Sequence, residues 1–95
     1  MGSTTKRYEN LESLLDEVDE KHLPDIVLQL LSEGKDVGKS YVIDAIRVLE
    51  RERNFKKAGI IAERAGLYEI ASRAYQKANR KEDVERVRKL LYSKI

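Results

Sequence analysis

Apolar residues recur at spacings of three and four along nearly the whole chain, which is the periodicity of an amphipathic α-helix. This pattern predicts a first helix over residues 10–21, a second over 24–34 and a third over 41–53. The clusters of strand-favouring residues, IV at 26–27 and YVI at 41–43, lie inside these helical patterns. No segment is therefore predicted to form a strand.

Residues with known preferences for helix ends mark these boundaries. Asn10 can cap the first helix, and Pro24 suits the first turn of the second because its missing N–H would be unpaired there. Gly34 is expected to end the second helix and Ser40 to cap the third. The residues expected to be buried are Leu11, Leu14, Leu15 and Val18, then Leu23, Ile26, Val27, Leu30 and Leu31, then Val42, Ala45, Ile46 and Leu49.

The second half of the chain repeats a pattern every thirteen residues. Residues 54–92 align in three rows of thirteen, NFKKAGIIAERAG, LYEIASRAYQKAN and RKEDVERVRKLLY. Each row predicts one short helix followed by a tight turn, because Gly and Asn best tolerate the left-handed conformation that closes a helix. The aligned columns are Ala58, Ala71 and Val84; Ile61, Ala74 and Val87; Ala65, Ala78 and Leu91; and Gly66, Asn79 and Tyr92.

Residues 55–78 resemble a tetratricopeptide repeat. The resemblance rests on small and aromatic residues at the expected spacings: Phe55, Ala58, Gly59 and Ala62, then Gly66 and Tyr68, then Ala71, Tyr75 and Ala78. The proline that closes the second helix in this family is absent. The helix over 81–93 would be half of another repeat or a terminal cap. The alternative to a repeat is a compact bundle of six helices.

The predicted fold is all-α, with about six short helices arranged as stacked antiparallel hairpins or as a compact bundle. Residues 1–7 are expected to be a disordered tail and 8–95 one helical domain, with an N-terminal helix pair over 10–34 and repeat-like hairpins over 40–93. The family resemblance implies a groove that accepts a partner protein or peptide. The first-helix residues expected to line it are Arg51, Arg53, Lys57, Ile60 and Arg64. Self-association into a homo-oligomer would extend such a groove.

Composition limits the choice of function. With 95 residues the chain fits one domain, and it has no cysteine for a disulfide or a thiolate metal site. No apolar run approaches the length of a membrane span, so a cytoplasmic location without a membrane partner is expected. Residues 1–47 carry 6 basic and 10 acidic groups, a balance of −4. Residues 48–95 carry 13 basic and 7 acidic groups, a balance of +6.

This asymmetry leaves two readings of the basic half. Charged helix faces are normally just solvated surface. The alternative is a patch that binds nucleic acid, RNA or DNA, by contacting its phosphates. The candidate residues for that patch are Lys77, Arg80, Lys81, Arg88 and Lys89.

The stretch GKDVGKS at 34–40 resembles a phosphate-binding loop, but its spacing fails. Only three residues separate Gly34 from Gly38, whereas the loop requires four before its Gly-Lys-Ser and should follow a strand. His22 is the one histidine and has no second ligand at metal-binding spacing. No catalytic residue, metal site or cofactor is therefore predicted. The expected function is non-catalytic protein–protein interaction, with nucleic-acid binding as the alternative.

Overall fold

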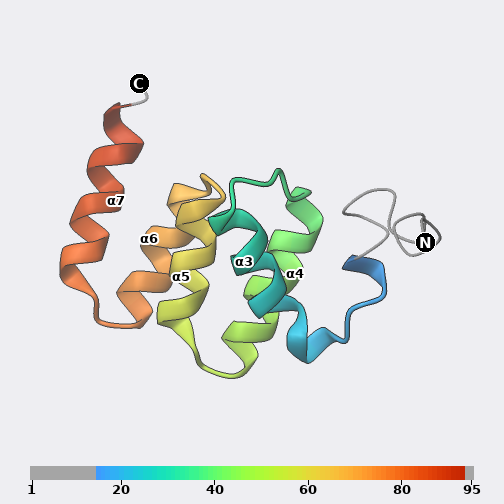
Figure 1. The fold of residues 1–95 in the computed structure, drawn as a ribbon. Helices are drawn as coiled ribbons and strands as arrows, with labels where there is room; N and C mark the ends of the chain where they lie inside the picture. Colours follow the sequence, from blue (N-terminus) through green and yellow to red (C-terminus); the bar gives the residue numbers. More distant parts are fainter. Residues whose placement is uncertain (1–14, 94–95) are drawn as a thin grey trace.

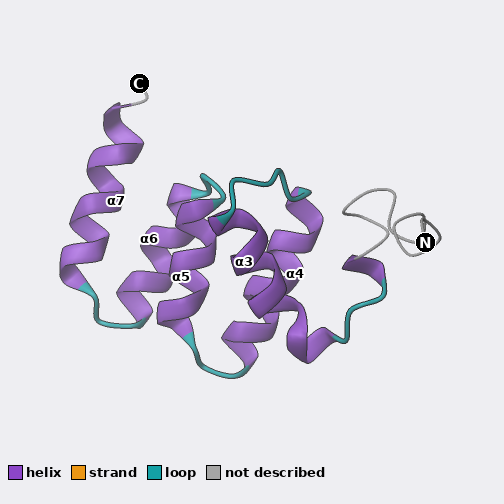
Figure 2. Ribbon diagram, in the orientation of Figure 1, coloured by secondary structure: helices purple, strands orange, loops and turns teal. Residues whose placement is uncertain are grey.

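The computed structural model describes residues 15–93 (Figure 1). The predicted all-α class is confirmed for this part of the chain, which consists of helices and loops without a strand (Figure 2). Five α-helices and one short 3-10 helix make up the described fold. They are η1 (Glu20–His22), α3 (Leu23–Ser32), α4 (Lys39–Arg51), α5 (Phe55–Arg64), α6 (Tyr68–Lys77) and α7 (Lys81–Ser93). The first of the six predicted helices, over residues 10–21, begins outside the described residues.

The prediction that this first helix runs to residue 21 is wrong. Its start and its cap Asn10 lie outside the described residues. Of the residues 15–21 that the structure describes, only Leu15 and Asp16 are α-helical. Asp19 has an extended backbone, with φ −60° and ψ 144°, and its carbonyl accepts hydrogen bonds from the N–H groups of His22 and Leu23. Pro24 lacks an N–H, so α3 has to begin as a new helix and cannot continue an earlier one. Leu15 is nonetheless buried, as predicted.

The third predicted helix begins two residues earlier than expected. Gly38, not Ser40, is the N-cap of α4, and its carbonyl accepts the first hydrogen bonds of the helix, from Tyr41 and Val42. Val37 just before the cap and Val42 in the first turn are both buried in the same core cluster. An apolar pair at these two positions fixes the entry of the chain into a helix. Burial of both residues favours a start of α4 at Lys39, and Ser40 lies inside the helix.

Left-handed turns recur every thirteen residues. Arg53, Gly66 and Asn79 have φ angles of 61°, 80° and 59° and follow α4, α5 and α6. The residue after each turn donates its N–H to a carbonyl five positions back, over 2.8, 2.8 and 2.9 Å, which is the bond that closes a helix. The turns predicted at Gly66 and Asn79 are confirmed. Tyr92 lies within α7, so the third row does not end in such a turn.

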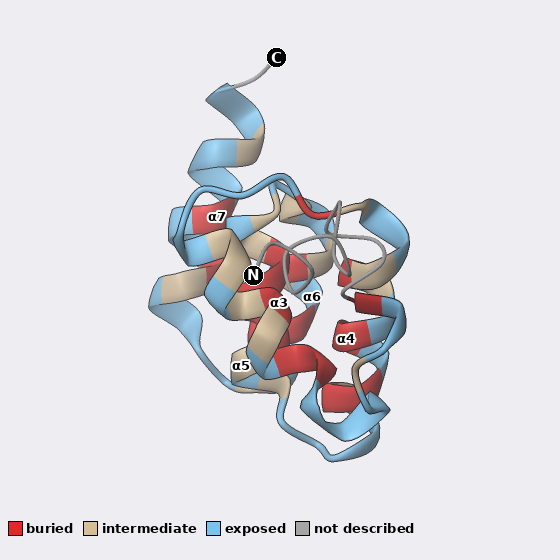
Figure 3. Cartoon of the chain, turned by 45° about the vertical axis from the view of Figure 1, so that its right-hand side comes forward, coloured by how far each residue is buried: buried red, intermediate tan, exposed pale blue. Residues whose placement is uncertain are grey.

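Helices that follow one another in the chain pack against one another. The pairs α3–α4, α4–α5, α5–α6 and α6–α7 all contact, and α3 also contacts α5. Lys57 forms an ion pair with Asp25, and Arg64 donates to Ser32 over 2.6 Å. These links join the beginnings and the ends of the two helices, so α3 and α5 run parallel. The C-terminal end of α7 extends beyond the other helices (Figures 1 and 3).

The buried residues lie along the inner faces of the helices (Figure 3). The first two predicted columns are confirmed as buried: Ala58, Ala71, Val84, Ile61, Ala74 and Val87 are all less than 9% exposed. The column of Ala65, Ala78 and Leu91 is half-buried. Within the described residues, no helix combines the length and the apolarity needed to cross a bilayer.

Candidate partner-binding site

A groove of about 520 Å³ lies where α5, α6 and α7 meet. It separates α5 from α7, and the tyrosines of α6 reach into it. Its lining residues are Lys56, Ile60, Glu63 and Arg64 from α5, Tyr68 and Tyr75 from α6, and Arg80, Asp83, Arg86 and Leu90 from α7 and the turn before it. We name it the α5–α7 groove.

A network of charged hydrogen bonds connects the walls of the α5–α7 groove. Arg86 donates to both carboxylate oxygens of Glu63, over 2.7 and 3.0 Å, and to Asp83 over 2.6 Å. The hydroxyl of Tyr75 also donates to Glu63, over 2.9 Å, and Arg80 donates to Asp83 over 2.8 Å. The guanidinium of Arg86 lies 5.9 Å from the centre of the Tyr75 ring. The network therefore ties α7 to α5 and α6.

The pKa values of these groups keep their charges fixed near neutral pH. Hydrogen bonds from Arg86 hold the pKa of Glu63 below its usual 4.5, although partial burial opposes the shift. Hydrogen bonds from Arg80 and then Arg86 lower the pKa of Asp83 below its usual 3.8. Burial and the nearby Glu63 carboxylate raise the pKa of Tyr75 above its usual 10.0, so its phenol remains a hydrogen-bond donor.

Three residues one helical turn apart on α5 face the groove: Lys56, Ile60 and Arg64. Lys56 has no ion-pair partner within the described residues, and Arg64 donates to the neutral hydroxyl of Ser32. Within residues 15–93, therefore, no carboxylate neutralises either positive charge. Leu90 of α7 lines the same groove and is 36% exposed, which leaves apolar surface opposite Ile60.

Two of the five residues predicted to line a partner groove, Ile60 and Arg64, are brought together here. The other three lie elsewhere. Lys57 follows Lys56 by a rotation of about 100° around the helix, which turns it toward Asp25 of α3. Arg53 occupies the left-handed turn before α5 and is exposed.

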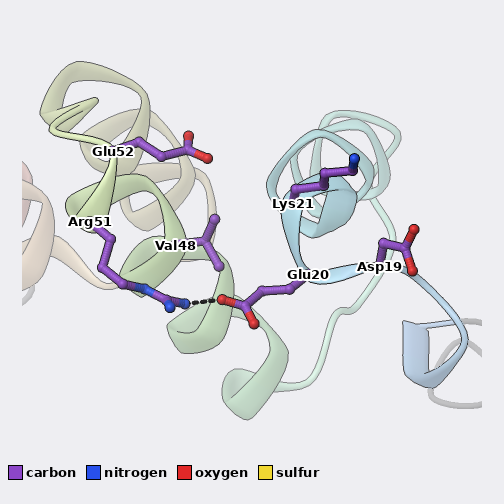
Figure 4. Close-up of a pocket in the computed structure, with 6 residues that line it drawn as sticks. All are labelled: Asp19, Glu20, Lys21, Val48, Arg51 and Glu52. Carbon is purple, nitrogen blue, oxygen red and sulfur yellow. Dashed lines mark hydrogen bonds and ion pairs between the residues drawn. The ribbon is translucent and has the colours of Figure 1, made fainter.

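Arg51 lines a different hollow, of about 460 Å³, between η1 and the end of α4 (Figure 4). There it forms an ion pair with Glu20, and Val48 and Glu52 lie on the same side of α4. Both charged side chains of the pair are more than 60% exposed. This hollow has charged groups of both signs and no network comparable to that of the α5–α7 groove.

The alternative basic patch is only partly assembled. Arg80, Lys81 and Arg88 line a hollow of about 340 Å³ on the side of α7 away from the groove. Glu85 lies among them, and Arg80 is already paired with Asp83. Lys77 lies over the Phe55 ring, 5.5 Å from its centre, and neither Lys77 nor Lys89 lines this hollow.

The stretch that resembled a phosphate loop connects two helices. Residues 35–38 follow α3 and lead into α4, so the segment does not emerge from a strand. Gly34 has a φ of 82° and closes α3 as predicted. His22 lies exposed in η1, and residues 15–93 contain no group of three or more His, Cys, Asp or Glu that could hold a metal ion.

Comparison with known proteins found no matching family model, no curated protein and no solved structure with significant similarity to this chain. The assignment of a site therefore depends on geometry alone. Sequence reasoning missed Lys56, Arg86 and Leu90. Lys56 could have been found, because it stands one turn before Ile60 and two turns before Arg64 on the same helix face.

Proposed function

We propose that this protein is a non-catalytic interaction module that binds a partner protein or peptide in the α5–α7 groove. The proposal is carried by one observation, which is that Ile60 and Leu90 offer apolar surface inside a concave site framed by charged groups. Removal of apolar surface from water drives most protein association. Polar groups around such a surface fix the orientation of what binds there.

We infer further that the hairpins α3–α4 and α5–α6 are two tetratricopeptide-like units. An interval of 32 positions separates Asp25 from Lys57 and Ser32 from Arg64, the pairs that link the two first helices. The same interval separates the left-handed residues Gly34 and Gly66. The period of tetratricopeptide repeats is 34 residues. In such an arrangement α3, α5 and α7 would be the first helices that line one concave face.

The outer face of α7 supports a role as a terminal cap. On α5, Gly59 and Ala62 are buried. The positions two rows of thirteen later, Glu85 and Arg88 on α7, are charged and exposed. A further helix could not pack closely on that face without burying these charges. Terminal units of helical repeats need such a polar outer face. A partner is therefore expected at the groove rather than at the end of the stack.

The proposal is tested by capture from extracts of the source cells, followed by direct binding of the identified partner. Leu90→Gln removes apolar surface from the groove, whereas Tyr92→Gln alters a neighbouring residue of α7 that is 65% exposed and does not line it. We expect Leu90→Gln to weaken binding of the purified partner about tenfold and Tyr92→Gln to leave it unchanged. Equal binding by both variants, or failure to identify any partner, would overturn the proposal.

The competing function is nucleic-acid binding, which is favoured by the shared hollow of Arg80, Lys81 and Arg88. Neutralisation of phosphates by such residues makes affinity fall steeply with added salt. Fluorescence anisotropy with single-stranded RNA and duplex DNA at low and moderate salt measures this. Tight, salt-sensitive binding that is lost in the double variant Lys81→Gln and Arg88→Gln would establish the competing function. Glu85 within the hollow makes it the weaker candidate.

A further inference from the structure

Lys56, Ile60 and Arg64 form a stripe along α5, and its length and charges limit what the α5–α7 groove can accept. Lys56 and Arg64 are eight residues apart, so two helical turns and about 12 Å separate them along the axis. Ile60 stands midway between them and lines the same groove. The stripe therefore places a cation, an apolar side chain and a second cation at intervals of one helical turn.

The charges inside the groove divide into two classes. Arg80, Arg86, Glu63 and Asp83 compensate one another through the hydrogen-bond network. Lys56 and Arg64 have no carboxylate partner within the described part of the chain. The uncompensated charge of the groove is therefore positive and lies at two points. A neutral partner would remove water from these cations without offering a charged group in its place. A carboxylate at each point would form an ion pair with them.

The apolar surface decides between an acidic peptide and a nucleic acid. Half-buried Ile60 lies between the two cations on α5. The exposed part of Leu90 lies on α7, which forms the other wall of the groove. A duplex presents its charged phosphates to a groove and leaves this aliphatic surface uncovered, and single-stranded bases stack on aromatic rather than aliphatic side chains. A peptide side chain such as Leu would cover it while flanking carboxylates reach Lys56 and Arg64. Complementary charge also excludes basic partners, because like charges at close range repel.

We infer that the α5–α7 groove binds an acidic segment of a partner protein in which an apolar side chain stands midway between two carboxylates about 12 Å apart. This inference rests on the proposed function and names the chemistry of its partner. In a helical segment the three groups fall at positions i, i+4 and i+8. In an extended segment they fall at i, i+2 and i+4, because each strand residue advances about 3.3 Å.

The test uses the full chain and two fluorescein-labelled probes, a helix-forming peptide with Glu, Leu and Glu at i, i+4 and i+8 and an extended peptide with the same groups at i, i+2 and i+4. We expect anisotropy to show binding of at least one probe and about three- to tenfold weaker binding when its two Glu are changed to Gln. Lys56→Gln and Arg64→Gln should each weaken binding to a similar extent. Lys89→Gln is the matched control, because Lys89 is an exposed cation of α7 outside the groove.

Several outcomes overturn the inference. These are no binding of either probe, equal loss in Lys89→Gln, or displacement of a bound probe by single-stranded RNA more readily than by the unlabelled acidic peptide. The failure of this inference is distinguishable from failure of the proposed function. If the captured partner depends on Leu90 but not on Lys56 or Arg64, the groove binds a protein of different chemistry. If it depends on none of the three, both proposals fail.

Discussion

The backbone of Gly59 on α5 lies against the ring of Tyr75 on α6. A β-carbon built on Gly59 would stand 2.7 Å from two carbons of that ring, closer than real contacts of this kind. Tyr75 is 2% exposed and its hydroxyl is bonded to Glu63, so the ring has little freedom to withdraw. In an open helix Gly→Ala is stabilising by about 0.5–1 kcal/mol. Here we expect Gly59→Ala to destabilise the fold by about 1–3 kcal/mol, measured by urea unfolding.

A double-mutant cycle isolates the contact. Tyr75→Leu removes the ring that Gly59→Ala would meet, so the cost of the alanine should largely disappear in that background. An alanine that costs the same with and without the ring would show that the close approach of α5 and α6 is not what requires glycine.

The turns offer a second prediction, which is a rank order. Arg53 and Asn79 are the two non-glycine residues with positive φ within residues 15–93, at 61° and 59°. The left-handed conformation costs an ordinary L-residue about 1–2 kcal/mol, and asparagine tolerates it better. Arg53→Gly should therefore stabilise the fold by up to about 1 kcal/mol, and Asn79→Gly by less. Thermal unfolding monitored by circular dichroism would detect the difference, and a larger gain at Asn79 would contradict it.

The network of the α5–α7 groove predicts a dependence of stability on pH. The folded-state pKa of Glu63 and that of Asp83 are both lowered, mainly by arginine hydrogen bonds. The unfolded chain then binds more protons than the folded one at acid pH, so the free energy of unfolding falls as the pH drops below about 4.5 and through the folded-state values. At neutral pH the full contribution is present.

Arg86→Gln should remove much of this dependence, because the carboxylates then titrate closer to their usual values. We expect a loss of about 1–2 kcal/mol at pH 7, since charged hydrogen bonds to partly buried Glu63 and Asp83 are lost, and a smaller loss at pH 3. Urea unfolding from pH 7 to pH 3 measures both. Arg88→Gln, on the other side of α7, is the control and should follow the wild-type curve. Parallel curves for wild type and Arg86→Gln would exclude a role for this arginine in the pH dependence.

Local patterns allowed much of the fold to be predicted. Burial of Ala58, Ala71 and Ile61 follows from helix periodicity, and the turns at Gly66 and Asn79 follow from residue preference. The start of α4 was misplaced because the burial of Val37 against the core decides it, and that contact is set by tertiary structure. The end of the first helix was misplaced because the apolar spacing continues to Val18, whereas the backbone is no longer helical after Asp16 and is extended at Asp19.

The site was harder to predict than the fold. Ile60 and Arg64 were expected to line a groove because the family resemblance implies that first-helix residues face a partner, and both line the α5–α7 groove. Arg86 and Leu90 belong to the site only because α7 is tied to Glu63 across the groove, which no spacing along the chain reveals. Lys57 was assigned to the groove because the family resemblance implies a first helix that faces a partner. In the structure Lys57 points toward α3, where it forms an ion pair with Asp25.

Two substitutions on α3 can separate the contribution of charged groups to the stability of the fold from that of the buried core. Asp25, whose side chain is 66% exposed, pairs with Lys57 where α3 meets α5, and Val27 of the same helix is fully buried in the core. Exposed ion pairs contribute at most about 1 kcal/mol, because water and salt screen them. Removal of two buried methyl groups costs about 1–3 kcal/mol, because apolar surface is lost from the core and a cavity remains. We therefore expect Val27→Ala to lower the urea midpoint clearly and Asp25→Asn to shift it little. If Asp25→Asn proves as costly as Val27→Ala, the ion pair rather than the apolar contact holds α3 on α5, and 0.5 M salt should then weaken the wild type to the same extent.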